Sequence, residues 1–310
     1  MIYTVTLNPA LDRELTVPAL TFDSVLRATA ARVDWGGKGF NVSRVLAVLG
    51  GESIALGFAG GRTGEALREG LASLGIMTGF IPIAGETRTN VSIVTEDCAH
   101  HIKVNEGGPT ISAEEQAALK ALVQKRARSG DWWVLAGSLP PGIEPSFYAE
   151  LIGDIKAAGG RVILDTSAEA LKCGYAAQPY LIKPNALEIS QLTGRPVNTV
   201  DEAIIAAGNL KGVEYIVVSM GRAGALLLHE GRGWFASAPA VQERNPIGAG
   251  DSLVAGLVWG FCQNSPTEAL RWGVACGAAT ASRSGTDIGT YQEIAQLAQQ
   301  IVVQEVYTLQ

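Results

Sequence analysis

The sequence predicts an α/β protein with a mostly parallel central sheet, helices on both faces of that sheet, and a second, small β-sheet. Short apolar runs bounded by turn residues alternate with segments of helical period along most of the chain. Such alternation requires right-handed crossovers and therefore parallel strands. Two stretches, Leu15–Trp35 and Thr87–Val104, instead alternate apolar and polar residues with the period of half-buried strands, which indicates the second sheet.

Composition and charge are those of an ordinary globular protein. The chain has 310 residues, 47% of them hydrophobic and 17% charged, with a net charge of -6 and a pI near 5.2. General nucleic-acid and anionic-membrane binders carry a basic face instead. No apolar run approaches the roughly 18 residues of a membrane span, and Met1–Arg13 lacks the basic start of a secretory signal. We therefore expect a cytoplasmic protein with neither nucleic acid nor membrane as a partner.

The cysteines indicate a reducing environment and no zinc site. None of the four forms a C-x-x-C pair, the spacing typical of zinc and redox motifs. They are Cys98, Cys173, Cys262 and Cys276.

Five apolar runs are predicted to be strands of the central sheet. The runs are Tyr3–Leu7, Trp132–Ala136, Val162–Leu164, Tyr180–Ile182 and Tyr215–Val218. Ligands bind at the carboxyl ends of the strands in parallel sheets, so polar residues that follow these runs should share one rim. The polar and turn residues that follow four of them are Gly137 and Ser138, Asp165, Lys183 and Asn185, and Ser219 and Gly221.

Three segments between the strands carry helix start or stop signals. A capping box pairs Ser or Thr with an acidic residue three positions later, and glycine stops a helix. The three are a helix from the capping box Ser112–Glu115 to Gly130, a helix Phe147–Ala158 before two glycines, and a helix that begins at the capping box Ser265–Glu268.

A glycine run opens a further helix and brings a carboxylate to its start. Gly248-Ala249-Gly250-Asp251 precedes the apolar segment Leu253–Phe261. A helix N-terminus offers unpaired N–H donors and partial positive charge, and glycines let phosphate oxygens approach the main chain. A carboxylate would repel a bound anion, so Asp251 is best explained if it faces the group that attacks phosphorus. The alternative is that Asp251 only complements the helix dipole.

The two alternating stretches carry basic residues against the acidic average of the chain. As a flap over the rim they would place cations above a ligand, where an arginine can bind a phosphate through two hydrogen bonds. The alternative is an ordinary solvated sheet face. The basic residues are Arg27 and Arg32 in the first stretch, and Arg88 and Lys103 in the second.

Common nucleotide-binding motifs are absent from the sequence. Residues 60–64 lack the lysine that completes a Walker P-loop, and neither 37–42 nor 248–253 meets the dinucleotide pattern G-x-G-x-x-G. The H-R-D and D-F-G motifs of protein kinases do not occur. A P-loop NTPase, a Rossmann dehydrogenase and a protein kinase are therefore disfavoured.

Five sequence blocks follow one another along nearly the whole chain. They are Asn8-Pro9-Ala10-Leu11-Asp12, Gly36-Gly37-Lys38-Gly39-Phe40-Asn41-Val42, Gly137-Ser138-Leu139-Pro140-Pro141-Gly142, Lys183-Pro184-Asn185 with Glu188, and Gly248-Ala249-Gly250-Asp251. In this order they resemble the ribokinase-like sugar kinases of the phosphofructokinase B group, most closely the branch that contains 1-phosphofructokinase and tagatose-6-phosphate kinase. Glycine-rich strings are individually weak signals, but five in order are not.

The resemblance implies a fold and a division of the chain. The fold is a ribokinase-like three-layer sandwich with a mostly parallel central sheet and a small β-sheet lid. Residues 1–310 would form one such domain, with a lid made by inserted segments of about 11–35 and 87–107.

The resemblance also implies phosphoryl transfer from ATP to a sugar hydroxyl, with Mg²⁺ as a cofactor. Asp251 would be the general base, and the N–H groups of Gly248, Ala249 and Gly250 would stabilise charge on the transferred phosphoryl. Two residues of the sugar block, Asp12 and Asn41, could equally cap turns. The whole sugar block would consist of Asp12, Gly37, Lys38 and Asn41.

A second set of residues resembles the nucleotide site of the family. Glu188 would act on Mg²⁺ through metal-bound water, as a hard carboxylate ligand can. The set comprises Lys183, Asn185 and Glu188 near the phosphates, Ser219, Gly221 and Gly224 around the phosphates and ribose, and Gly277 and Ser282 near the adenine.

Substrate choice within the family depends on the flap. Three cations there suit an acceptor that already carries a phosphate, so we expect a phosphorylated ketohexose, fructose 1-phosphate first, with tagatose 6-phosphate or fructose 6-phosphate as alternatives. A non-catalytic sugar-phosphate or nucleotide-binding regulator and a metal-dependent hydrolase that uses Glu188 are alternatives of other classes. The residues that fall where phosphosugar members bind this phosphate are Arg27, Arg88, Lys103 and Ser138, with Asn90 close by.

Two features leave the regulation and the assembly open. The family usually has Thr two residues before the first glycine of its last block, and Pro246 stands there. Proline lacks both the hydroxyl and the N–H, which puts the monovalent-cation dependence of some relatives in question. The apolar flap suggests a homodimer that pairs flap to flap, although a monomer with a closing lid fits as well.

Overall fold

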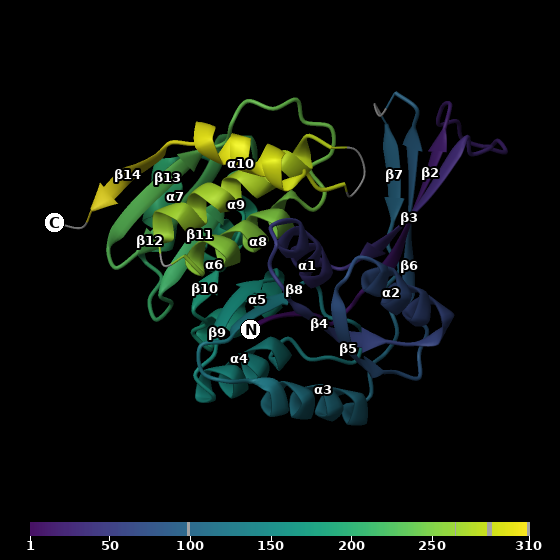
Figure 1. Ribbon diagram of the computed structural model, residues 1–310, viewed down its shortest axis with the longest axis horizontal. Helices are drawn as coiled ribbons and strands as arrows, with labels where there is room; N and C mark the ends of the chain where they lie inside the picture. The colour runs from purple at the N-terminus through teal and green to yellow at the C-terminus, as the bar shows by residue number, and fades with distance from the viewer. Residues whose placement is uncertain (98–99, 264, 284–286, 309–310) are drawn as a thin grey trace.

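The computed structural model describes residues 1–97, 100–263, 265–283 and 287–308, and these form two sheets with helices around the larger one (Figure 1). From β5 to β11 the larger sheet is parallel, and the last three strands add to it in antiparallel fashion. Its strands, in spatial order, are β14 (Val303–Thr308), β13 (Arg232–Ser237), β12 (Gly224–His229), β11 (Tyr215–Ser219), β10 (Leu181–Ile182), β9 (Arg161–Asp165), β8 (Trp132–Ala136), β1 (Ile2–Thr6), β4 (Ile54–Ala59) and β5 (Met77–Pro82).

Helices cover both faces of this sheet, as a three-layer sandwich requires. One face carries α1 (Lys38–Val48), α8 (Ala249–Phe261), α9 (Pro266–Ala281) and α10 (Tyr291–Gln300). The other carries α3 (Ala113–Arg126), α4 (Phe147–Ala157), α5 (Ala168–Ala176), α6 (Ala186–Thr193) and α7 (Val200–Gly208). Beside β4 and β5 lies α2 (Gly61–Ser73).

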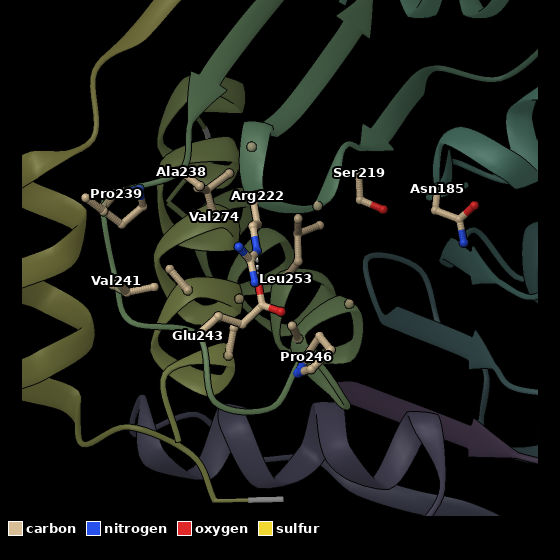
Figure 2. A pocket seen from close by; sticks show the side chains of 18 residues that line it. Asn185, Ser219, Arg222, Ala238, Pro239, Val241, Glu243, Pro246, Leu253 and Val274 are labelled. Atoms are coloured by element: carbon tan, nitrogen blue, oxygen red, sulfur yellow. Dashed lines mark hydrogen bonds and ion pairs between the residues drawn. The ribbon is translucent and has the colours of Figure 1, made fainter. Parts of the chain in front are cut away.

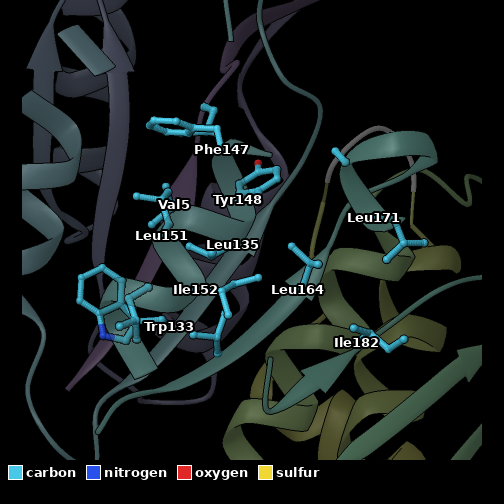
Figure 3. Close-up of a cluster of buried hydrophobic side chains, with 14 of the residues drawn as sticks. Val5, Trp133, Leu135, Phe147, Tyr148, Leu151, Ile152, Leu164, Leu171 and Ile182 are labelled. Atoms are coloured by element: carbon cyan, nitrogen blue, oxygen red, sulfur yellow. The ribbon is translucent and has the colours of Figure 1, made fainter. Parts of the chain in front are cut away.

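Strand β8 shows why the central strands are continuously apolar. Trp133 and Leu135 pack with α4 on one face (Figure 3), whereas Trp132 and Val134 belong to the core under α8 on the other. Neighbouring side chains of a strand point to opposite faces, and both faces are covered here. The strand is therefore fully buried, and its polar ligand-facing residues can only follow its end.

The five predicted central strands are confirmed to within about two residues at their ends. The antiparallel extension, β12 to β14, and the parallel strands β4 and β5 were not predicted. Strand β12 is an uninterrupted apolar run that begins with Gly224, and such runs fit a strand or a buried helix segment equally well.

The predicted helices form, with two differences in detail. Helix α3 ends at Arg126 rather than near Gly130, because Ala127 turns extended and buries its side chain in the core. At α9, the Ser265 hydroxyl accepts from the Glu268 N–H, but the Glu268 carboxylate pairs with Arg271 at 3.1 Å, so only half of a capping box forms.

The smaller sheet contains the two stretches with alternating pattern, but its strand β2 begins at Ala10, five residues before the first stretch. Its order is β3 (Ala30–Gly36), β2 (Ala10–Val17), β6 (Arg88–Thr95) and β7 (His101–Val104), with a parallel β2–β6 pair between two antiparallel pairs. It projects to one side of the larger sheet (Figure 1).

The register gives the smaller sheet two chemically different faces. One row across it is polar and places Asp34, Asp12 and Asn90 side by side. The next row, on the opposite face, contains Val91 and Val104 beside Arg13 and Val33. The polar face adjoins α1, since Arg44 of that helix is electrostatically coupled to Asp34 and Asp12.

Two further sequence expectations concern the cysteines and membrane spans. Cys98 lies outside the described residues. In the part of the chain that is described, none of the helices combines the length and the apolar character that crossing a bilayer would need.

Candidate active site

The glycine loop and Asp251 sit at the start of a helix that is buried on all sides. Gly248 is the N-cap of α8 with a φ of 81°, a conformation that favours glycine, and Asp251 lies in the first turn with 6% of its surface exposed. A Cβ added to Gly256 or Gly260 would meet the backbone of α9 within 2.4 Å. Direct backbone contact with α9 therefore fixes α8 and, with it, the position of Asp251.

Asp251 points toward α1 rather than back along its own helix. The Asn41 amide donates to its Oδ2 at 2.8 Å. Burial, followed by the negative charge of Asp165, raises the pKa of Asp251 to about 6, while Lys38, Asn41 and Lys183 act in the opposite direction. A carboxylate with this pKa is ionised at neutral pH and still accepts a proton readily, which suits a general base.

Two lysines flank the same space and share one carboxylate. Lys38, the first residue of α1, and Lys183, after β10, each place Nζ 3.3 Å from Oδ1 of Asp165. Burial opposes ionisation of Asp165, but the two ammonium groups hold its pKa below the ordinary range. The sequence placed Asp165 on the rim without a role; its only signal was a carboxylate directly after a buried strand.

The polar face of the smaller sheet brings Asp12 and Asn90 together. The Asn90 amide donates to Asp12 Oδ1 at 2.7 Å, and Asp12 Oδ2 approaches the backbone of Gly36 so closely that a Cβ there would lie 2.4 Å away. Gly37, the N-cap of α1, has a φ of 148° and precedes Lys38. The predicted sugar block therefore converges where the smaller sheet meets α1.

Arg88 is occupied by main-chain carbonyls. Its guanidinium donates to the carbonyls of Asn8 and Glu106, both at 2.8 Å, and to that of Pro9 at 3.4 Å. Burial lowers the pKa of Arg88, but not enough to remove its charge at neutral pH. The side chain thus clamps the entry from β1 into β2 to the segment that leaves β7.

The other residues expected at the acceptor phosphate are less enclosed. Arg27 is exposed in the loop between β2 and β3, and Ser138 is exposed directly after β8. Lys103 is exposed on β7, in the row that the register places on the same face as Asp12 and Asn90.

A cavity of about 570 Å³ opens beside the glycine loop (Figure 2). Its wall is largely apolar and includes Leu253 of α8, Val274 of α9 and Val241 of the preceding loop. A concave, mostly apolar site with a few polar groups at one end is typical of nucleotide and cofactor pockets. The predicted residues that line it are Asn185, Ser219, Gly221, Gly224, Ala249, Gly250 and Gly277.

Ser282 lies elsewhere. It lines a separate hollow of about 200 Å³ and donates its hydroxyl to the Ala279 carbonyl near the end of α9. Its expected place near the adenine rested on a weakly specific segment: α9 lines the large cavity up to its last residue, Ala281, and Ser282 follows as the C-cap outside that lining.

An ion pair in the cavity wall was not predicted. Arg222 follows β11 and Glu243 belongs to the loop between β13 and α8, and their Nε and Oε2 atoms lie 2.6 Å apart (Figure 2). No motif marks this loop, because its path over the cavity is set by tertiary packing. Pro246, from the same loop, also lines the cavity.

Glu188 lies at the start of α6 in a reciprocal capping box. Its Oε2 accepts from the Asn185 N–H, and the Asn185 side chain accepts from the Glu188 N–H, both at 2.8 Å. Among the described residues no three His, Cys, Asp or Glu side chains gather as metal ligands. Mg²⁺ commonly takes one or two carboxylates, waters and substrate phosphates rather than a protein cage, so a single half-buried carboxylate fits a water-mediated site.

Comparisons with known proteins cover this whole arrangement. The model of the pfkB family carbohydrate kinases matches residues 6–293. The chain belongs to this family. It is therefore an ATP-dependent carbohydrate kinase, and the mostly parallel sheet with its small companion sheet is the ribokinase-like fold that the sequence predicted.

The chain is similar over nearly its full length to several sugar-phosphate kinases. It is 38% identical to a 1-phosphofructokinase from Vibrio cholerae, covering 99% of this chain and 97% of the relative. It is 34% identical to a tagatose-6-phosphate kinase from Staphylococcus epidermidis, covering 99% and 100%. The structure of phosphofructokinase-2 from Escherichia coli with substrates and products superposes with a TM-score of 0.92 at 32% identity, covering 96% and 98%. The same E. coli enzyme is also known with potassium and in a tetrameric inhibited form.

Proposed function

We propose that this kinase transfers the γ-phosphate of ATP to a hydroxyl of a phosphorylated ketohexose, with fructose 1-phosphate as the main acceptor. One observation carries the proposal. The Asp251 carboxylate, the ammonium groups of Lys38 and Lys183 and the glycine loop lie together beside a nucleotide-sized cavity. The similarity to 1-phosphofructokinases supports this acceptor, and tagatose 6-phosphate and fructose 6-phosphate are the alternatives.

In this proposal Asp251 takes the proton from the attacking hydroxyl. Ionised at neutral pH, it faces Asn41 and the sugar block rather than the glycine loop, so it would meet the acceptor and not the phosphate. Phosphoryl transfer depends mainly on positioning and on stabilising charge. The N–H groups of Gly248, Ala249 and Gly250 and the ammonium group of Lys183 would supply that stabilisation.

The large cavity would hold the nucleoside part of ATP. Its apolar walls from α8 and α9 suit a flat base, and Gly221, Gly224 and Ser219, which also line it, would face the ribose and phosphates. Glu188 would hold Mg²⁺ through water, and the ion would neutralise charge on the phosphates.

The acceptor's own phosphate would bind at the smaller sheet. Arg88 and Lys103 supply positive charge on or near its polar face, and in this proposal Arg27 would approach from the exposed loop and Ser138 from the main rim. Arg88 uses three of its donors on carbonyls, and guanidinium has five, so it retains capacity for a phosphate oxygen. Asn90 would act through Asp12, to which it donates.

We further propose that residues 1–310 form one domain in which the smaller sheet, from segments of about 11–35 and 87–107, acts as a lid and as the contact of a homodimer. Its outer face exposes Val33 and Val104, and Ile102 is on the same face. These side chains come from the two edge strands of the sheet, with Arg13 and Val91 between them in the register, and apolar side chains exposed on one face are typical of a protein interface. Light scattering of the wild type and of Val104→Glu tests this: a dimer that the variant splits is expected.

One assay tests the reaction. Fructose 1-phosphate, fructose 6-phosphate, tagatose 6-phosphate, fructose, ribose and adenosine are each supplied with Mg-ATP, and ADP release is measured. The highest kcat/KM is expected for fructose 1-phosphate and the lowest for the neutral sugars. ATP and phosphosugar binding without ADP release would instead indicate a regulator, and ADP release without an acceptor would indicate a hydrolase.

A further inference from the structure

Asp165 is a buried carboxylate that the proposed chemistry does not yet use. It follows β9, and Lys183 follows β10, in a register that pairs Leu164 with Ile182. The two residues therefore leave neighbouring parallel strands side by side, and the Lys183 N–H donates to the Leu164 carbonyl at 3.1 Å. Lys38 reaches the same carboxylate from the first turn of α1.

The carboxylate is too enclosed to contact a ligand. Asp165 is 1% exposed, its Oδ1 lies 3.3 Å from both lysine Nζ atoms, and its Oδ2 has no hydrogen-bond partner among the described residues. A buried charge is costly unless it is paired, and an unpartnered buried oxygen calls for an explanation. Any effect of Asp165 on a substrate must therefore pass through the lysines.

Both lysines have donors to spare, and those of Lys183 lie on the side of the glycine loop. An ammonium group carries three N–H donors, and Asp165 accepts one from each lysine. Lys183 Nζ lies 3.7 Å from the position that a Cβ on Gly250 would occupy. An oxygen atom bound at the N-terminus of α8 would thus lie within reach of a donor that Asp165 has already oriented.

We propose that Asp165 is a positioning residue for phosphoryl transfer, which fixes Lys38 and Lys183 with their free donors toward the transferred phosphoryl group. This inference rests on the proposed function, because it assigns the lysines to that group. A lysine side chain has several rotatable bonds. Because one carboxylate holds both lysines in place, less side-chain entropy must be lost on reaching the transition state.

Asp165→Asn tests the proposal by removing the charge and keeping the shape. We expect kcat to fall about 100-fold while KM for ATP and for the phosphosugar each change less than about threefold, since the loss is confined to the transition state. Asp131→Asn is the matched control: Asp131 is also a buried carboxylate, paired with the N-terminal ammonium at 3.1 Å before β8. Its kcat should stay near wild type, and equal losses in both variants would overturn the proposal.

The pH profile separates positioning from mere stability. After burial, the charge of Asp165 is the largest cause that raises the pKa of Asp251 to about 6. Removing that charge should move the acid limb of kcat/KM below pH 6, because the base then loses its proton more easily. Asp131→Asn, which removes a carboxylate charge beside the N-terminal ammonium instead, should leave this limb in place, and an unmoved limb in Asp165→Asn would contradict the inference.

A measurement on ligand-free protein keeps this inference separate from the reaction assay. The pKa of Lys38 is raised above its ordinary value of 10.5, chiefly by Asp165, and NMR of the ammonium group should show it falling in Asp165→Asn. This holds even if no phosphosugar is phosphorylated, which would overturn only the proposed function. If the variant does not fold, the wild type decides: a Lys38 that titrates at or below 10.5 refutes the inference.

Discussion

The two sides of the active site recognise their ligands by different physics. On the nucleotide side, apolar residues of α8, α9 and a loop enclose a cavity of about 570 Å³, and one ion pair, Arg222–Glu243, lies in its wall. On the sugar side, charged and amide groups are joined by short contacts, such as Asn90 to Asp12 and Asn41 to Asp251.

The contrast follows from what each ligand offers. A nucleobase has large apolar faces and is recognised largely by shape, whereas a phosphosugar has hydroxyls and a dianionic phosphate that require placed partners. A substitution on the nucleotide side should therefore change ATP binding alone. A substitution on the sugar side should change acceptor binding or turnover.

The largest effect is expected at the junction of the two sides, for Asp251→Asn. Turnover should fall at least about 100-fold, because the general base is lost. ATP binding, measured by calorimetry, should be retained, because Asp251 faces Asn41 and not the cavity.

The same variant should be more stable than wild type at pH 7. The pKa of Asp251 is raised in the folded state to about 6, so its contribution to stability is full below the unfolded value of 3.8 and is lost as the pH rises through 6. A neutral amide avoids that loss. Thermal unfolding should show the gain in stability at pH 7 but not at pH 4. In the turnover measurement above, a near-normal rate would show that Asp251 takes no part in the chemistry.

Arg88→Ala sharpens the contrast on the sugar side. KM for the phosphosugar should rise about 10- to 100-fold through loss of a charge-assisted phosphate contact, with KM for ATP within about twofold. Because Arg88 also clamps main-chain carbonyls, Glu106→Gln is the control: it weakens the contact of Glu106 with the Thr89 N–H in the same segment and removes no cation. Equal damage to both substrates in Arg88→Ala would contradict the assignment.

Ala278→Phe makes the complementary change on the nucleotide side. Ala278 lies on α9 and lines the large cavity, where a phenyl ring would occupy space needed by the base. KM for ATP should rise about tenfold, equivalent to ~1.4 kcal/mol, while KM for the phosphosugar stays within about twofold. A larger effect on the phosphosugar would break the division between the two sides.

The smallest effect concerns Pro246, which lines the cavity but offers neither a hydroxyl nor an N–H. Turnover of the wild type should change less than about twofold when Na⁺ replaces K⁺. The same exchange in Pro246→Thr is the informative comparison, since it restores the residue usual in the family. Strong activation of the wild type by K⁺ would show that the cation binds without this side chain.

Local patterns determined much of the fold and part of the site. Alternating polarity predicted the smaller sheet, and glycine spacing predicted the loop that precedes Asp251. Such local patterns cannot predict contacts between residues that are far apart in the sequence. The donation from Asn41 to Asp251 joins residues 210 positions apart, and the loop that brings Glu243 to the cavity has no sequence signature.

The register explains other misses. Asp165 and Lys183 meet because β9 and β10 are neighbours, and strand order cannot be read from the runs themselves. Lys38 was predicted as a sugar ligand from its motif, and that role stays a prediction; its ion pair with Asp165 is a contact that the motif does not indicate. The roles predicted for individual site residues stay predictions that the variants above will test.

The seam where α8 packs against α9 restricts substitutions at positions that contact no ligand. At Gly256 and Gly260 the two main chains touch, and even a methyl group would force the helices apart. Neither glycine faces a substrate, yet each determines where the reactive end of α8 stands. Libraries that aim to change acceptor choice should leave this seam untouched, since inactive clones from it would be misread as lost recognition.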